Sequence, residues 1–212
     1  MVEMKRIQHE IRPSKTALIL LDLTHAFIAP GAAFEIPAAR SMLPRVRTLA
    51  DACRAAGVQV VHCSYVHNEK ATHMSDAWPL LREGVLDAES QGIAVVDELR
   101  SDADLFVEKK TYGAFHRSAL EDELRKRDID TVIIGGCATN YSCYTTAREA
   151  QSREFKVVFL SDGTATFDLP DGGFGTISAD VVQRSFLTTV SFGCGHVMSV
   201  EETIQVLNNA AA

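Results

Sequence analysis

Short apolar runs alternate with amphipathic segments along the whole chain. Five runs have the length and the Val, Ile and Leu content of strands buried on both faces, and a sixth, shorter strand is expected around Val197. The five runs are 16–21, 57–63, 105–107, 131–136 and 156–160. Between the runs, apolar residues recur every three or four positions, as on the inner face of a helix. The expected helices are 38–56, 118–127, 142–153, 178–192 and 200–208.

This order of strands and helices predicts a three-layer α-β-α fold. Parallel strands joined by right-handed helical crossovers form a sheet that helices cover on both sides. We therefore expect a single Rossmann-like domain over residues 1–212, with a mostly parallel sheet of about six strands. Ligands of such sheets bind beyond the carboxyl ends of the strands. The long, irregular segment 66–104 is expected to cover the substrate.

Composition and charge narrow the class of protein. The 212 residues are 46% hydrophobic and 23% charged, and the net charge is −7. This balance argues against a broad basic surface that would attract nucleic acids or anionic lipids, although it is compatible with a local basic patch. No apolar run approaches the roughly 18 residues of a membrane span, and the N-terminus has no signal-peptide core. We expect a cytoplasmic protein that acts on a small molecule, with neither a nucleic acid nor a membrane as partner.

The cysteines support a reducing compartment. Their number is odd and no C-x-x-C spacing occurs, which is typical of free buried thiols rather than of disulfides or a zinc knuckle. The five are Cys53, Cys63, Cys137, Cys143 and Cys194.

Two charged residues follow expected strands. Asp22 comes directly after 16–21, where a carboxylate suits a general base or proton shuttle; an Asp that caps the next turn is the alternative. Lys109 and Lys110 follow 105–107, and alternate side chains of a strand point to opposite sides. One lysine can therefore face the sheet edge. Taken alone, either lysine is interpreted as a solvated surface charge, and the small and aromatic residues of 111–115 weaken that interpretation because they pack tightly where a lysine would otherwise extend into water.

Segment 135–150 reads Gly-Gly-Cys-Ala-Thr-Asn-Tyr-Ser-Cys-Tyr-Thr-Thr-Ala-Arg-Glu-Ala. Small residues follow the strand, and a helix is expected to begin at about Ser142. The first free amides of that helix would stabilise the anion of a nucleophile and could form an oxyanion hole. A tight turn with an N-capping serine is the alternative.

Three motifs in this order resemble the isochorismatase-like cysteine hydrolase superfamily. They are Asp22 with Phe27 five residues later, Lys109 in K-x-x-Y-x-A-F, and G-x-A-T-N-x-(nucleophile)-x-x-x-T-A-R-x-A. The resemblance covers about 16–207, and the chain is most similar to the branch of biuret and triuret hydrolases and N-carbamoylsarcosine amidase. It implies a hydrolase of linear amide C–N bonds that needs no cofactor, with Asp22 as acid/base and Lys109 as the lysine of the triad.

The nucleophile position departs from the family pattern. By the resemblance, the thiol lies three residues after Thr139 and four before Thr146, and both counts lead to Ser142. Three explanations remain open: an engineered Cys→Ser form that binds substrate without reacting, a natural serine variant or pseudoenzyme, and a role for Cys143 after a one-residue shift. The last is weakened because one step along a helix rotates the side chain by about 100°.

For a cysteine at this position, the resemblance implies nucleophilic amide hydrolysis. Asp22 takes the thiol proton, sulfur attacks the carbonyl carbon, and the backbone amides of Ala138 and residue 142 hold the oxyanion. Asp22 then protonates the departing ammonia and activates the water that cleaves the thioester. The family commonly has a non-proline cis peptide before the oxyanion-hole residue, which here would be Cys137-Ala138. A serine hydroxyl needs a stronger adjacent base than an Asp with a Lys, so the chain with Ser142 is expected to be nearly inactive.

No metal site is expected. The nicotinamidase branch of the superfamily carries an Asp-x-His ion site after its second strand, but the corresponding stretch here is Ser64-Tyr65-Val66-His67, which lacks the aspartate. His67 and His73 lie six residues apart without a close carboxylate, so a solvated or substrate-facing role is favoured.

Residues for the substrate come from the same resemblance. A glutamine at about the distance of Gln183 from the nucleophile helps bind a ureido group in the branch named above, because one amide can pair with a urea edge. Segment 168–175 is glycine-rich and is interpreted as a flexible loop over the site. The residues expected to contact the substrate are Phe27, Tyr112, Thr139, Asn140 and Gln183.

Two other functions stay open. Enol-ether hydrolysis of an isochorismate-like substrate uses Asp22 and Lys109 without a thiol, and it would need a cationic pocket, for which Arg12, Arg82 and Arg184 are the candidates. A non-catalytic binding protein is the other. The resemblance also implies a homodimer or homotetramer in which a neighbour covers the pocket.

Overall fold

Six parallel strands form one sheet in the computed structural model, which describes residues 3–68 and 72–210. The order across the sheet is β3-β2-β1-β4-β5-β6. The strands are β1 (Thr16–Leu21), β2 (Gln59–Tyr65), β3 (Leu105–Lys109), β4 (Thr131–Cys137), β5 (Lys156–Ala165) and β6 (His196–Met198). The predicted parallel α/β sheet is confirmed. The largest difference in strand bounds is at β5, which continues to Ala165 instead of ending at 160.

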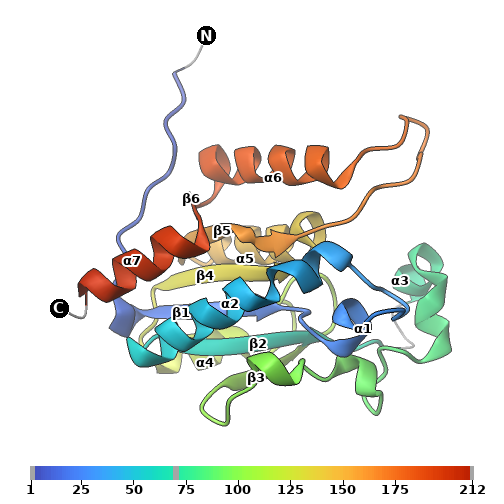
Figure 1. Cartoon of the computed structure of the whole chain (residues 1–212), viewed down its shortest axis with the longest axis horizontal. Helices are drawn as coiled ribbons and strands as arrows, with labels where there is room; N and C mark the ends of the chain where they lie inside the picture. The colour runs from blue at the N-terminus through green and yellow to red at the C-terminus, as the bar shows by residue number, and fades with distance from the viewer. Residues whose placement is uncertain (1–2, 69–71, 211–212) are drawn as a thin grey trace.

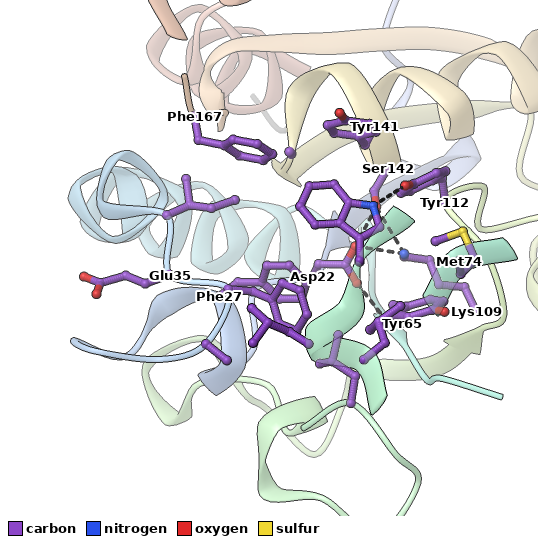
Figure 2. Close-up of a pocket in the computed structure, with 18 residues that line it drawn as sticks. Asp22, Phe27, Glu35, Tyr65, Met74, Lys109, Tyr112, Tyr141, Ser142 and Phe167 are labelled. Carbon is purple, nitrogen blue, oxygen red and sulfur yellow. Dashed lines mark hydrogen bonds and ion pairs between the residues drawn. The ribbon is translucent and has the colours of Figure 1, made fainter. Parts of the chain in front are cut away.

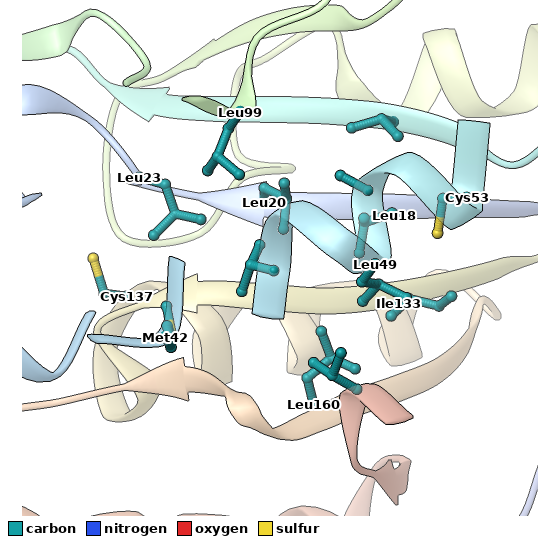
Figure 3. Packing of buried hydrophobic residues seen from close by; sticks show 14 of the residues in the cluster. Leu18, Leu20, Leu23, Met42, Leu49, Cys53, Leu99, Ile133, Cys137 and Leu160 are labelled. Carbon is teal, nitrogen blue, oxygen red and sulfur yellow. The ribbon is translucent and has the colours of Figure 1, made fainter. Parts of the chain in front are cut away.

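Helices cover both faces of the sheet (Figure 1). The cluster that contains Leu18 and Leu20 packs under α2 (Pro37–Ala55) and α7 (Val200–Ala210), as Figure 3 shows for α2. The opposite face, with Ala17 and Ile19, packs against α4 (Leu120–Lys126), α5 (Tyr144–Ser152) and part of α6 (Ala179–Gly193). All six residues of β1 are buried, because a central parallel strand has a helical layer on each side.

The order of the strands places the site. The chain builds outward from β1 to β2 and β3 on one side and to β4, β5 and β6 on the other. The switch point therefore lies between β1 and β4, where a crevice forms beyond their carboxyl ends. Gly136 allows the backbone of β4 to lie close to the end of β1. Its φ is +118°, and a Cβ there would lie 2.1 Å from the carbonyl oxygen of Leu21. The residue that follows Leu21 is Asp22.

Two expectations about local structure need correction. Segment 66–104 is not irregular throughout: it contains α3 (Thr72–Ala77) and three 3₁₀ turns, Pro79–Glu83, Gln91–Ile93 and Asp97–Leu99. The helix expected from Ser142 starts earlier, with a π-helical turn over Thr139–Cys143 that leads into α5. A further short helix, α1 (His25–Ile28), follows Asp22. Within the described ranges, none of the helices combines the length and apolar character needed to cross a membrane.

Candidate active site

Asp22, Lys109 and Ser142 meet at the carboxyl end of the sheet (Figure 2). The Ser142 hydroxyl donates to Asp22 Oδ2 at 2.6 Å. The Lys109 ammonium lies 2.8 Å from the same oxygen and donates to Ser142 Oγ at 3.1 Å. All three residues are buried. Segments 87 and 33 residues apart in sequence thus form a closed triangle of charged and hydroxyl groups.

The carboxylate of Asp22 is held from two sides. Its backbone adopts φ +54° directly after β1, and its amide donates to Cys63 O at 3.0 Å. Its Oδ1 accepts from the backbone amide of Tyr65 at 2.8 Å, so Oδ2 remains for Lys109 and Ser142. A residue other than glycine at positive φ costs energy and persists where the surroundings fix it. The backbone at the carboxyl ends of β1 and β2 therefore sets which carboxylate oxygen of Asp22 faces position 142.

Lys109 ends the edge strand β3 and points inward. Only 1% of its surface is exposed. Besides its contacts with Asp22 and Ser142, its ammonium donates to Thr111 O at 3.2 Å, and it lies 5.1 Å from the centre of the Tyr65 ring. Lys110 points the other way and pairs with Glu108 at the surface. The three donors of the buried ammonium thus have acceptors, as a buried charge requires.

Ser142 lies in the π-helical turn that follows β4. The peptide bond Cys137-Ala138 is cis, at the position that the resemblance implied. The carbonyl of Ala138 accepts from the amides of Tyr141 at 3.1 Å and Cys143 at 3.2 Å. Ala138 and Ser142 both line the pocket described below.

Cys143 faces away from this site. Its side chain is completely buried in the cluster under α4 and α5 and does not line the pocket. Burial raises the pKa of the Cys143 thiol well above its usual value, so the thiolate that a nucleophile needs is disfavoured. The structure therefore argues against the one-residue shift from Ser142 to Cys143. The five cysteines are free and buried.

Above the triad is a cavity of about 280 Å³, a size that suits a small molecule. Its walls are largely apolar and aromatic, and they come from α1, the turn before α2, α3 and the segments at or after the ends of β2, β3, β4 and β5. The aromatic residues are Phe27, Phe34, Tyr65, Trp78, Tyr112, Tyr141 and Phe167. The aliphatic residues include Ile36, Met74, Leu80, Leu81 and Leu86.

Charge in the pocket is confined to three residues. Lys109 and Asp22 neutralise each other on its floor. Glu35 lies on the opposite side, with its carboxylate turned outward (Figure 2), where it pairs with Arg40 and accepts from the Gly31 amide at 2.7 Å. Among the described residues that line this cavity, the only cation is thus already paired, and no basic group remains for a carboxylate of a substrate.

The three candidate arginines lie elsewhere. Arg12 pairs with Asp130, Arg82 with Asp76 and Arg184 with Asp180. None of the three arginines lines the cavity. The cationic pocket that an isochorismate-like dicarboxylate would need is therefore not formed by them.

Comparisons with known proteins agree with this geometry. The isochorismatase domain matches residues 16–189. The chain belongs to the isochorismatase family.

Two relatives and one solved structure are similar to this chain over most of its length. It is 33% identical over 188 residues to Nicotinamidase 3 of Arabidopsis thaliana, covering 81% of this chain and 88% of that one. It is 27% identical over 223 residues to the ureidoacrylate amidohydrolase of Agrobacterium fabrum, covering 95% and 93%. The crystal structure of a cysteine hydrolase from Pseudomonas syringae pv. phaseolicola has a TM-score of 0.95 and 33% identity, covering 99% and 100%.

The substrate residues expected from the family resemblance separate into two groups. Phe27 and Tyr112 line the cavity, whereas Thr139, Asn140 and Gln183 do not. The Thr139 hydroxyl donates to Gln183 Oε1 at 2.6 Å, and Gln183 Nε2 contacts the carbonyl and hydroxyl oxygens of Thr164 at 3.3 and 3.1 Å. The Gln183 amide therefore ties α6 to β5 and to the π-helical turn. Asn140 accepts from the Thr166 hydroxyl at 2.6 Å.

Segment 168–175 does not cover the site in this family member. None of its residues lines the cavity, although Phe167, directly before it, does. The segment forms an arm that extends away from the sheet (Figure 1). Leu169 and Ile177 exchange two backbone hydrogen bonds, and Phe174 at the tip is 94% exposed.

The stretch after β2, compared above with the ion site of the nicotinamidase branch, does not fit a metal ion. Both ring nitrogens of His67 lie 3.1 Å from hydroxyl groups, those of Tyr65 and Ser75. His73 is exposed on α3. Throughout 3–68 and 72–210, no three His, Cys, Asp or Glu residues gather into a set that could hold a metal. No step of the reaction is therefore assigned to a metal.

Sequence reasoning missed most of the cavity wall. Phe34, Met74, Trp78 and Phe167 lie outside the three motifs that carry the family resemblance, and their convergence depends on the path of the segments between strands. One signal pointed to them: Trp78 is the only tryptophan of the chain and lies in the segment expected to cover the substrate.

Proposed function

We propose that this chain has the active site of a hydrolase that cleaves the amide C–N bond of a small, uncharged substrate through an acyl intermediate at position 142. The observation that carries the proposal is the position of Ser142 Oγ, 2.6 Å from Asp22 Oδ2 and 3.1 Å from Lys109 Nζ at the floor of the cavity. Relatives that are named as amidohydrolases or as a nicotinamidase support the amide C–N bond as the target.

The contacts supply each proton transfer for a cysteine at position 142. Asp22 Oδ2 takes the thiol proton, the sulfur forms a bond to the carbonyl carbon, and the C=O π electrons move to oxygen. When the oxyanion collapses, the C–N bond breaks and Asp22 protonates the nitrogen, which leaves as ammonia or an amine. Water then gives a proton to Asp22 and a hydroxyl to the thioester, which releases the acid and restores the thiol.

The oxyanion is assigned to the backbone amides of Ala138 and residue 142. Both residues line the cavity, and a helix begins directly after them with α5. Fixed amides aimed at a developing negative charge are an effective form of transition-state stabilisation. Lys109 adds a positive charge next to the thiolate and favours that form.

Ser142 makes the chain as it stands a form that binds its substrate with almost no turnover. An unperturbed cysteine is already a few per cent thiolate at pH 7, whereas a serine hydroxyl depends entirely on the adjacent base. That base is a single carboxylate paired with a lysine, without a histidine. We propose that Ser142 stands where a working enzyme has cysteine.

The Ser142→Cys variant tests this proposal. Ammonia release is measured with the parent, Ser142→Cys and Ser142→Ala over one panel: biuret, triuret, other ureido amides, aryl carboxamides and a carboxylate-bearing ureido compound. We expect Ser142→Cys to exceed the parent by about a hundredfold or more, because a competent nucleophile–base pair contributes at least that factor. Adding Cys143→Ala to Ser142→Cys should leave turnover in place. Binding of panel members without turnover in any variant would instead favour a binding protein.

The cavity favours uncharged members of that panel. Its lining is mostly apolar, and its one cation is paired with Asp22, so a substrate carboxylate would be desolvated without a partner. Biuret-type and triuret-type ureido amides remain within the proposal because they are uncharged. The hydrogen bonds of the Gln183 amide with Thr139 and Thr164 leave it turned away from the cavity, so the proposal assigns it no direct contact with a ureido group.

We further propose that the protein is cytoplasmic and associates with copies of itself. Five free, buried cysteines suit a reducing compartment. Four large hydrophobic side chains are exposed between residues 174 and 192, Phe174, Ile177, Val181 and Phe192, and exposed apolar surface in this part of the chain is available for contact with a second copy. Light scattering should give a mass above 23.1 kDa, and Phe174→Asp should lower it. A monomeric parent would refute self-association.

A further inference from the structure

The ring of His67 connects two walls of the cavity. His67 lies two residues beyond the end of β2, and its amide donates to Leu86 O at 2.7 Å. On one side, its Nδ1 lies 3.1 Å from the Tyr65 hydroxyl. On the other side, its Nε2 lies 3.1 Å from the Ser75 hydroxyl. The imidazole therefore joins the end of a sheet strand to helix α3.

On the sheet side, Tyr65 contacts the catalytic groups directly. Its backbone amide holds Asp22 Oδ1 at 2.8 Å, and its ring faces the Lys109 ammonium at 5.1 Å. Tyr65 is itself buried and lines the cavity. A change in the orientation of its ring would therefore alter the surroundings of Lys109.

On the helix side, Ser75 fixes a short element that forms the cavity wall. α3 has six residues, too few for an isolated helix to hold its shape in water. It carries Met74 into the cavity, and Trp78 follows directly after it. The Trp78 indole donates to the Tyr112 hydroxyl at 2.7 Å. Ser75 and Trp78 thus provide polar anchors for a segment whose Met74 and Leu81 pack in an apolar cluster with Tyr65.

The hydrogen-bond capacities of the three side chains match. A neutral imidazole has one donor and one acceptor, and each hydroxyl can take either role. Burial raises the pKa of Tyr65 to about 12, so its hydroxyl keeps its proton at neutral pH. Both ring nitrogens of His67 can therefore be satisfied in either tautomer. A metal ion at this position would have to displace one of the two hydroxyls.

We propose that His67 is a positioning residue that sets the cavity wall formed by α3 and Trp78 against the Tyr65 ring. Its relevance to substrate rests on the proposed function. Its effect on the wall does not, and this difference allows two independent measurements.

The first measurement needs no turnover. Trp78 is the only tryptophan, so fluorescence excited at a wavelength beyond tyrosine absorption reports on this wall alone. In the parent chain, His67→Ala should shift the Trp78 emission to longer wavelength and raise the acrylamide quenching constant by about threefold, because two anchoring hydrogen bonds are lost. His67→Gln, which retains a donor and an acceptor, should restore much of the parent signal. His73→Ala is the matched control, because His73 is an exposed histidine of α3. It should change neither the emission wavelength nor the quenching constant.

The second measurement uses the Ser142→Cys background. His67→Ala should raise KM by about tenfold and change kcat by less than about threefold, because binding rather than chemistry depends on this wall. An unchanged quenching constant in His67→Ala would overturn the proposal, as would one equivalent of Zn²⁺ bound by the parent and lost in His67→Ala. If Ser142→Cys shows no turnover while the fluorescence shift occurs, the proposed function fails and the positioning role stands.

Discussion

The buried pair of Lys109 and Asp22 gives a quantitative prediction about stability. Its two charged atoms lie 2.8 Å apart, with side-chain exposures of 1% and 3%. Lys109→Met keeps a similar length and removes the charge; among the residues that the structure describes, the Tyr65 amide and the Ser142 hydroxyl then remain as partners of the Asp22 carboxylate. Removing one member of a buried ion pair costs about 3–5 kcal/mol of unfolding free energy.

For a chain of this size, that cost is large enough to measure by thermal unfolding. A change of 1 kcal/mol shifts the melting temperature by about 2–4 °C, so Lys109→Met should melt about 6–20 °C below the parent. The double variant Asp22→Asn/Lys109→Met removes both charges and should recover most of the loss. The coupling between the two sites should then be about 2 kcal/mol or more in a double-mutant cycle.

Lys110→Met is the matched control for this experiment. Lys110 is the next residue along the chain and pairs with Glu108 at the surface, where ion pairs contribute less than about 1 kcal/mol. Its melting temperature should stay close to that of the parent. A Lys109→Met variant that melts within about 2 °C of the parent, or a double variant that is no more stable than Lys109→Met, would refute the reasoning.

Two further predictions concern backbone geometry and pH. Gly136→Ala should destabilise the fold by about 3 kcal/mol or more, because the new Cβ would meet the Leu21 carbonyl oxygen; Gly172→Ala, which meets nothing within 4 Å, should have little effect on urea denaturation. Burial lowers the pKa of His62 below its usual 6.5 despite a hydrogen bond with Asp104. As the pH falls, His62 is therefore protonated in the unfolded chain before it is protonated in the folded chain. The free energy of unfolding should then decrease as the pH falls through 6.5 and below. His62→Gln should reduce that decrease, and an unchanged pH profile would contradict it.

The sequence determined the sheet and pointed to the residues that are proposed for catalysis. A continuous apolar run such as 16–21 is typical of a strand that is buried on both faces between helical layers. The alternation of such runs with amphipathic segments was therefore enough to predict a parallel sheet. Asp22 and Lys109 follow such runs, and Ser142 follows a third. Because parallel strands end at the same edge, residues that follow them converge whatever lies between.

Only the tertiary structure decided the partners of individual side chains. The same residue types at the same spacing allow Gln183 to face a substrate or to hold Thr139, and His67 to bind a metal or to join Tyr65 to Ser75. Periodicity predicts the face on which a side chain lies, but its partner depends on how distant segments are packed. The cavity wall also depends on the packing of distant segments. Trp78 reaches the cavity through the path of α3, and its indole is held there by the hydrogen bond to the Tyr112 hydroxyl.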